Sequence, residues 1–133
     1  RHRRTVTLDG AAGSVEIHDE IHCGKSHDIC FHLHFSEHCE VELSGDHGLS
    51  VDFGGGKMSV EIDPRMSLSI EKGRENPIQG WVSQGYHRKT PSPTVAARCV
   101  GNGELSLRTK ITVDKAPIVA ARGQSHAGAS TCA

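Results

Sequence analysis

The sequence is poor in aromatic residues and has no long apolar run. Of its 133 residues only 4% are aromatic, with one tryptophan and one tyrosine. The core must therefore be built mainly from Val, Ile, Leu and Ala side chains, with few large anchors. No run approaches the ~18 apolar residues of a membrane-spanning helix, so no membrane span is predicted. Motifs for phosphate or nucleotide binding and a nucleophile elbow are also missing.

The chain also lacks an excess of charge of either sign. Fifteen basic and 16 acidic side chains give a formal net charge of -1. Without a basic field, no binding to nucleic acid is predicted. The first residue is Arg and no signal peptide is visible, which we interpret as a chain that starts inside a longer precursor or after processing.

The five cysteines do not form the pattern of a disulfide framework. Their number is odd, their spacing is irregular, and no CxxC pair occurs. Most are interpreted as small, half-buried hydrophobic side chains. Cys30 and Cys39 would pair if adjacent strands brought them close together.

Apolar and polar residues alternate along most of the chain. No segment has a helical period, and turn signals recur every 8–12 residues or so, as in sandwiches. The sequence therefore predicts an all-β fold, an antiparallel β-sandwich over residues 1–113. Residues 114–133 are rich in Ala, Gly and Ser and are predicted to form a mobile, largely disordered tail.

Within residues 1–113 the pattern predicts where strands begin and end. Val15–Ile21 and Ile29–Phe35 are expected to be separate strands, Gly101–Gly103 a turn between two more, and residues 73–93 a loop. The predicted core consists of the inward-facing apolar residues of these strands: Val6, Leu8, Val15, Ile17, Ile29, Phe31, Leu33, Val41, Leu43, Val51, Val60, Ile62, Leu68, Ile70, Val95, Leu107 and Ile111.

Seven of the ten histidines lie between residues 18 and 47. His32 and His34 are two apart on a predicted strand, so both project from one face, about 7 Å apart. Together with Cys30, His18 or His22 they would suit zinc, copper or nickel. The alternative is that they are polar outer-face residues, because Phe31, Leu33 and Phe35 take the inner face. The second interpretation is preferred, and no cofactor is predicted. Glu16, Asp19 and Glu20 are interpreted as ordinary solvated residues.

The predicted loop contains the other candidate group. Trp81 can stack on a sugar ring, while Tyr86, His87 and Arg88 are residue types that suit proton abstraction beside a uronate carboxylate. Arg88 and Lys89 also offer cations to carboxylate or sulfate groups. The alternative is that Trp81 and Tyr86 fix the loop against the sandwich. Trp81, Tyr86, His87 and Arg88 are the candidate substrate-binding residues, with anchoring the preferred role for Trp81.

Four segments together resemble the C-terminal part of heparinase II/III-like polysaccharide lyases. They are HRRTVTL at His2–Leu8, VEIHDEI at Val15–Ile21, DICFHLHFSEHCEV at Asp28–Val41 and GWVSQGYHRKTPSPTV at Gly80–Val95. The family often has Pro at the position of Ser36, and usually Gly at that of His87. The resemblance covers roughly residues 1–113, with the segments in the family's order and spacing.

The resemblance implies the architecture of a larger enzyme. Family members have an N-terminal α/α toroid followed by antiparallel sheets, and their lyases cleave acidic polysaccharides by β-elimination. The resemblance places the catalytic and metal-binding positions upstream of the segment that begins at His2, so no catalytic residue is assigned here. It implies a non-catalytic β-sandwich that supports a toroid domain of the same protein, periplasmic or secreted, and meets acidic polysaccharide through the full-length enzyme. The alternative is a free-standing carbohydrate-binding or adhesion-like β module.

Overall fold

The structure, a computed structural model, describes residues 1–114 and consists of strands and turns. The predicted tail at 114–133 lies outside the described residues except for Asp114. Among the residues described, no helix is long and apolar enough to cross a membrane. The strands in chain order are β1 His2–Asp9, β2 Ser14–His34, β3 Glu40–Ser44, β4 Gly48–Asp52, β5 Lys57–Ile62, β6 Ser67–Glu71, β7 Arg74–Glu75, β8 Ile78–Gln79, β9 Trp81–Gly85, β10 Arg88–Pro91 and β11 Thr94–Val113.

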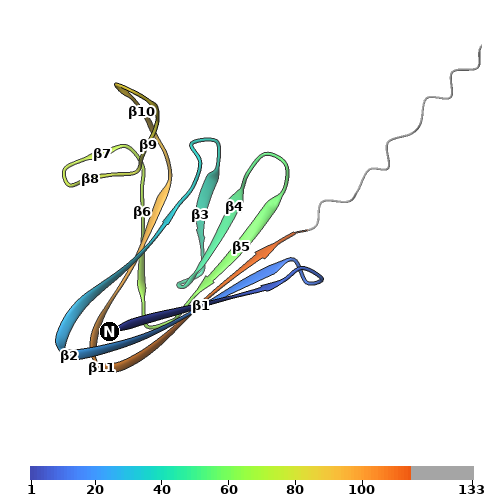
Figure 1. The fold of residues 1–133 in the computed structure, drawn as a ribbon. Coiled ribbons are helices and arrows are strands. Elements are labelled where there is room, and N and C mark those ends of the chain that lie inside the picture. The colour runs from blue at the N-terminus through green and yellow to red at the C-terminus, as the bar shows by residue number, and fades with distance from the viewer. Residues whose placement is uncertain (115–133) are drawn as a thin grey trace, which may run out of the picture.

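Two long strands dominate the fold. β2 has 21 residues and β11 has 20, and they pair antiparallel over almost their whole length. Both bend at the lower left of Figure 1, so that one sheet folds over into two layers. The order in this sheet is β1-β2-β11-β5-β4-β3, with β6 pairing the first part of β11. The all-β prediction is confirmed, and all the pairs are antiparallel.

Two predicted boundaries inside these long strands are wrong. Val15–Ile21 and Ile29–Phe35 lie largely on one strand, β2. Gly101–Gly103 does not reverse the chain; it is a register shift at which β11 bends. A Cβ atom on Gly101 would lie 2.4 Å from the Ile29 side chain, and Gly103 has a φ of 72°. Glycines here therefore allow close packing and a bend rather than a turn.

The core lies between the two layers. From one layer come Val95 and Ala97 of β11, with Leu33 and Phe31 of β2 beside them in register. From the other come the buried side chains of Leu49, Val51, Val60, Ile62 and Leu107. Sheets with one apolar face pack in this way. Leu49 and Met66 were absent from the predicted core but are among its most deeply buried members.

Three predicted core residues are exposed. Leu8 is 74% exposed, Val6 60% and Leu43 53%. Val6 and Leu8 lie on β1 and Leu43 on β3, which are the two edges of the sheet. All three side chains are on the same side of the sheet as the core, but no described residue of the opposite layer covers them.

Residues 73–93 form two small hairpins rather than the predicted loop. β7 pairs with β8, and β9 with β10 (Figure 1). Gly80 joins the two hairpins with a φ of 77°, and its carbonyl accepts hydrogen bonds from the backbone N–H groups of Gly73 and Ser92. We call this segment the double hairpin. The four cysteines in the described part are free, including Cys30 and Cys39.

Candidate functional site

The outer tip of the double hairpin carries three of the four predicted substrate-binding residues. Tyr86, His87 and Arg88 lie at the turn from β9 to β10, and all three are exposed. Tyr86 is 90% exposed, and its ring meets the His87 ring edge-on at 4.0 Å. The three side chains face solvent and form no enclosed site.

Trp81 lies at the base of the same hairpin, where its side chain contacts Arg74 and Lys89. Its indole Nε1 donates a hydrogen bond to the Arg74 carbonyl at 2.9 Å, which connects the two hairpins. The Lys89 ammonium lies 3.9 Å from the centre of the ring and also pairs with Glu75. This cation–π contact occupies an aromatic face that a sugar would need. The geometry supports the anchoring interpretation of Trp81.

The structure brings Trp81 together with the two predicted metal candidates. A groove of about 480 Å³ separates the double hairpin from the outer face of β2 and β11. We call it the outer groove. The side chains that bear on its chemistry are His32, His34, Gln79, Trp81 and Arg98. Sequence reasoning treated His32 and His34 as unrelated to the hairpin, and it missed Gln79 and Arg98.

The outer groove is lined by donor groups of Arg98 and Gln79 for which no acceptor is found among residues 1–114. Within the described residues, no ion pair engages Arg98, and the Gln79 Nε2 atom is buried without a hydrogen-bond partner. The groove has no acidic residue in its lining. The rings of His32 and His34 stack at 6.0 Å, and His34 Nδ1 lies 3.1 Å from Thr94 Oγ1. Such a surface is suited to a ligand rich in acceptors.

The same histidines do not form a metal centre with their neighbours. Cys30 Sγ lies 3.3 Å from His32 Nε2, so these two groups meet on the outer face of β2. Over residues 1–114, no three His, Cys, Asp or Glu side chains are grouped so that they could hold an ion. The third ligands considered from the sequence, His18 and His22, lie on the other half of β2, beyond its bend.

The chain was also compared with known proteins. Residues 1–108 match the family model described as Heparinase II/III-like, C-terminal. The chain belongs to this family. It is thus a β-module of a kind associated with polysaccharide lyases, and the outer groove lies within the matched residues. A comparison with curated proteins gave no match.

The first two segments that resemble the heparinase II/III-like family contact each other. His2 Nε2 lies 2.7 Å from Asp19 Oδ1, and Arg4 donates to both Asp19 oxygens, at 2.7 and 2.9 Å. The Arg4 guanidinium also lies 5.1 Å from the centre of the Phe31 ring. Arg3 and Glu20 form a longer pair, at 3.9 Å on the other face. The HRR run and the Asp-Glu pair thus join β1 to β2.

Asp19 corrects a prediction. It is only 6% exposed, not solvated, because it lies on the inner face of β2 between Ile17 and Ile21. Burial raises the pKa of Asp19, but hydrogen bonds from Arg4 and His2 outweigh it and leave the pKa below its usual value. The charged form is therefore stabilised in the folded protein.

Replacing Asp19 should destabilise the fold, and replacing its neighbour Glu20 should not. Asp19→Ala leaves Arg4 without its partner, and we expect a loss of about 1–2 kcal/mol because Arg4 is partly screened by solvent. Glu20→Ala removes an exposed pair and should cost less than about 0.5 kcal/mol. Urea unfolding of both variants measures the difference. Equal losses would contradict the assignment.

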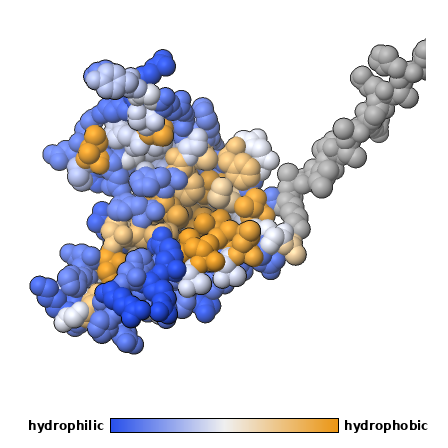
Figure 2. Space-filling model, viewed as in Figure 1, coloured by the Kyte–Doolittle hydropathy of each residue, from blue (hydrophilic) through white to orange (hydrophobic). Residues whose placement is uncertain are grey.

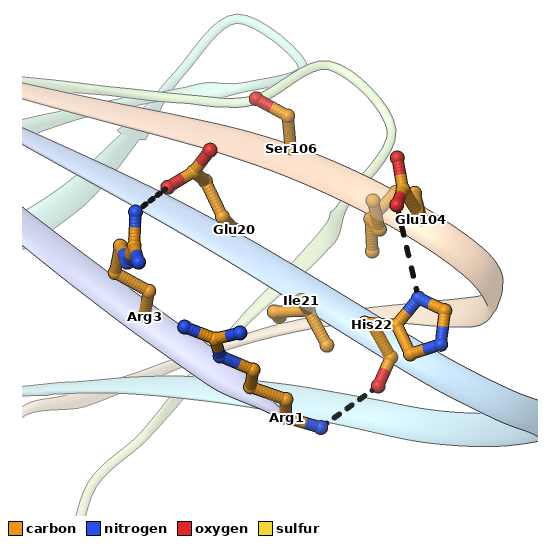
Figure 3. A pocket seen from close by; sticks show the side chains of 8 residues that line it. Arg1, Arg3, Glu20, Ile21, His22, Glu104 and Ser106 are labelled. Carbon is orange, nitrogen blue, oxygen red and sulfur yellow. Dashed lines mark hydrogen bonds and ion pairs between the residues drawn. The ribbon is translucent and has the colours of Figure 1, made fainter.

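Another cavity, of about 310 Å³, lies beside the start of β1 (Figure 3). It is lined by charged residues of both signs. Arg3 pairs with Glu20, and His22 with Glu104, each at 3.9 Å. The cavity lining holds the guanidinium groups of Arg1 and Arg3 and the carboxylates of Glu20 and Glu104. Because these side-chain charges balance, the cavity is less suited to an ionic ligand than the outer groove.

Proposed function

We propose that the chain is the non-catalytic β-sandwich part of a heparinase II/III-like polysaccharide lyase. In this proposal the full enzyme is periplasmic or secreted and cleaves acidic glycans, such as glycosaminoglycans, by β-elimination. The catalytic groups belong to a toroid domain of the same protein, and the β-sandwich supports that domain. Membership of the family supports the proposal, as does an apolar surface that the described residues leave uncovered.

The uncovered surface continues the core towards both edges of the sheet. One row of apolar residues crosses six strands in register: Leu8, Val15, Ile111, Val60, Leu49 and Leu43. Val60 and Leu49 in the middle are buried, whereas Leu8 and Leu43 at the ends are exposed. Figure 2 shows hydrophobic side chains gathered on this side of the molecule. We call this surface the apolar face.

The apolar face is the observation that carries the proposal. Large contiguous apolar patches on a protein surface indicate an interaction site. Val6 and Val113 add exposed side chains to the same face, beside Leu8 and Met58 respectively. Because few charges interrupt it, the face suits a stable contact with another domain better than a contact with a polar glycan.

The free-standing carbohydrate-binding module receives less support. It would need Trp81 and Tyr86 exposed together on a concave face. In the structure, Trp81 is hydrogen-bonded at the hairpin base and covered by Lys89, while Tyr86 is at the tip. The two aromatic rings do not form a common platform.

Making the apolar face polar should abolish docking without unfolding the module. We expect the wild-type chain to co-elute with the α/α-toroid domain of a heparinase II/III-like lyase added in trans. The double variant Leu8→Ser/Leu43→Ser should not co-elute, because it removes the apolar side chains at both ends of the row. Its stability should change little, since both residues are exposed. Size-exclusion chromatography and circular dichroism measure the two effects.

A matched control uses the neighbouring residues that face the other way. Thr7→Ser/Glu42→Ser changes β1 and β3 at exposed positions on the outer face. This variant should dock as the wild type does. Co-elution of both variants, or of neither variant nor the wild type, would contradict the assignment of the apolar face.

A further inference from the structure

The outer groove and the apolar face are on opposite sides of the sheet. Side chains of His32 and His34 alternate with those of Phe31 and Leu33, which pack against the core. A domain seated on the apolar face would therefore leave the outer groove open. A ligand in the groove and a partner on the face can bind at the same time.

The groove combines groups from segments that are distant in the sequence. His32 lies on β2, Arg98 on β11, and Gln79 and Trp81 on the double hairpin. The Arg98 carbonyl accepts a hydrogen bond from the Ser67 hydroxyl. The Arg98 guanidinium makes no ion pair with the described residues. A guanidinium fork of this kind suits a carboxylate group.

Gln79 provides a second and independent indication of a ligand. Its Nε2 atom is buried and has no hydrogen-bond partner in residues 1–114. Leaving a buried donor without a partner is costly, so such groups in native proteins often await a ligand or a water molecule. Gln79 lines the same groove as Arg98 and the two imidazoles, and its amide lies just beneath the groove surface.

We infer that the outer groove binds an acidic saccharide, with the carboxylate of one uronate unit accepting hydrogen bonds from Arg98 and, once its side chain turns into the groove, from the Gln79 amide. His32 and His34 then face the sugar hydroxyls. The absence of acidic residues from the lining favours an anion over a neutral sugar. This inference rests on the proposed function only for the kind of glycan. The groove places the binding site at the base of the double hairpin, not at the tip residues Tyr86, His87 and Arg88.

The fluorescence of Trp81 can measure ligand binding in the outer groove. Trp81 is the single tryptophan of the chain and lines the groove, so its fluorescence reports on occupancy. We expect trigalacturonate to cause a saturable change in Trp81 emission. The carboxyl-reduced trisaccharide, which has the same linkages without the charges, should bind at least tenfold more weakly. Added salt should weaken binding of the charged probe.

Two matched variants distinguish binding in the outer groove from non-specific electrostatic attraction to the protein surface. Arg98→Gln should weaken trigalacturonate binding tenfold or more, whereas Lys57→Gln removes the same charge from β5, outside the lining of the groove, and should leave it unchanged. Gln79→Met removes the unpartnered donor with little change of volume. We expect weaker binding together with an unchanged or higher melting temperature, a combination that a purely structural role for Gln79 does not produce.

Three results would overturn the inference. They are no saturable response to trigalacturonate at millimolar concentration, equal affinity for the carboxyl-reduced probe, and equal weakening by Arg98→Gln and Lys57→Gln. None of these bears on docking of the toroid through the apolar face, so failure here and failure of the proposed function are distinguishable.

Discussion

Asp63→Ala should cost the fold about 2–3 kcal/mol, because it removes the group that holds the corner between β5 and β6 to β11. Asp63 is 8% exposed and lies between β5 of one layer and β6 of the other. Its carboxylate accepts hydrogen bonds from the Arg65 side chain at 2.7 Å and from the Arg108 backbone N–H at 3.2 Å. Removing it leaves those donors without a partner.

The charge of Asp63 also makes stability depend on pH. Hydrogen bonds from the Arg65 side chain lower the pKa of Asp63 from 3.8 to about 2. Because the folded-state pKa is depressed, the contribution is complete above the unfolded value and is lost as pH falls through about 2. A shift of this size corresponds to about 2 kcal/mol. The difference in unfolding free energy between the wild type and Asp63→Asn should therefore stay constant from neutral pH down to about the unfolded value of 3.8 and then shrink as the pH falls to about 2.

The control for Asp63 is another carboxylate of the same chain. Asp28 is exposed on β2, and no hydrogen bond or ion pair of its side chain occurs within residues 1–114. Asp28→Ala should change stability by less than about 0.5 kcal/mol. Denaturant unfolding at two pH values compares the variants. A loss for Asp63→Ala no larger than for Asp28→Ala would show that the corner is not held in this way.

Alternation along the strands was enough to predict the fold class, but it could not show where strands end. A strand that bends keeps its period of two through the bend, so β2 looks like two strands in the sequence. Gly101 and Gly103 suit a turn and a bulge equally well. Which of the two forms depends on the partner: here β2 pairs with β11 on both sides of the bend.

The burial of Asp19 was indicated by the alternation of the strand, but its acidic neighbours led to the opposite prediction. Asp19 stands two residues after Ile17, so the alternation that placed Ile17 inside also places Asp19 inside. Its acidic neighbour Glu20 suggested a solvated stretch. The partners that make burial tolerable, His2 and Arg4, are 17 and 15 residues away and meet it only through the β1–β2 register.

The outer groove could not be predicted from any pattern along the chain. His32 and Trp81 each stood out as residue types, but Gln79 and Arg98 had no local signal. The four come together only because the double hairpin lies beside the outer face of β2 and β11. Pairing of distant segments, rather than spacing within one, decides which residues share a groove.

Gly80→Ala should destabilise the double hairpin by about 3 kcal/mol, because both the backbone conformation of Gly80 and its surroundings exclude a side chain. Gly80 has a φ of 77°, which costs a residue with a side chain roughly 1 kcal/mol or more. A Cβ atom would also lie 2.7 Å from the Glu71 carbonyl oxygen and 2.7 Å from the Lys72 Cα atom. Backbone atoms cannot move aside as a flexible side chain can, so overpacking adds about 1–3 kcal/mol.

Substitutions at two other glycines distinguish the cost of the positive φ from the cost of the close contacts of the added Cβ atom. Gly54 has the same φ of 77° with no atom within 4 Å of an added Cβ, so Gly54→Ala measures the cost of the backbone conformation alone. Gly10 has open space and no positive φ, and Gly10→Ala should be nearly neutral.

We expect thermal unfolding to rank Gly80→Ala as the least stable, then Gly54→Ala, then Gly10→Ala. Because Gly80 connects Trp81 to the rest of the groove, Gly80→Ala should also shift Trp81 emission towards that of a solvated indole. If Gly80→Ala instead melts with Gly54→Ala and keeps the native emission, the close contact with Glu71 and Lys72 does not hold the double hairpin in place.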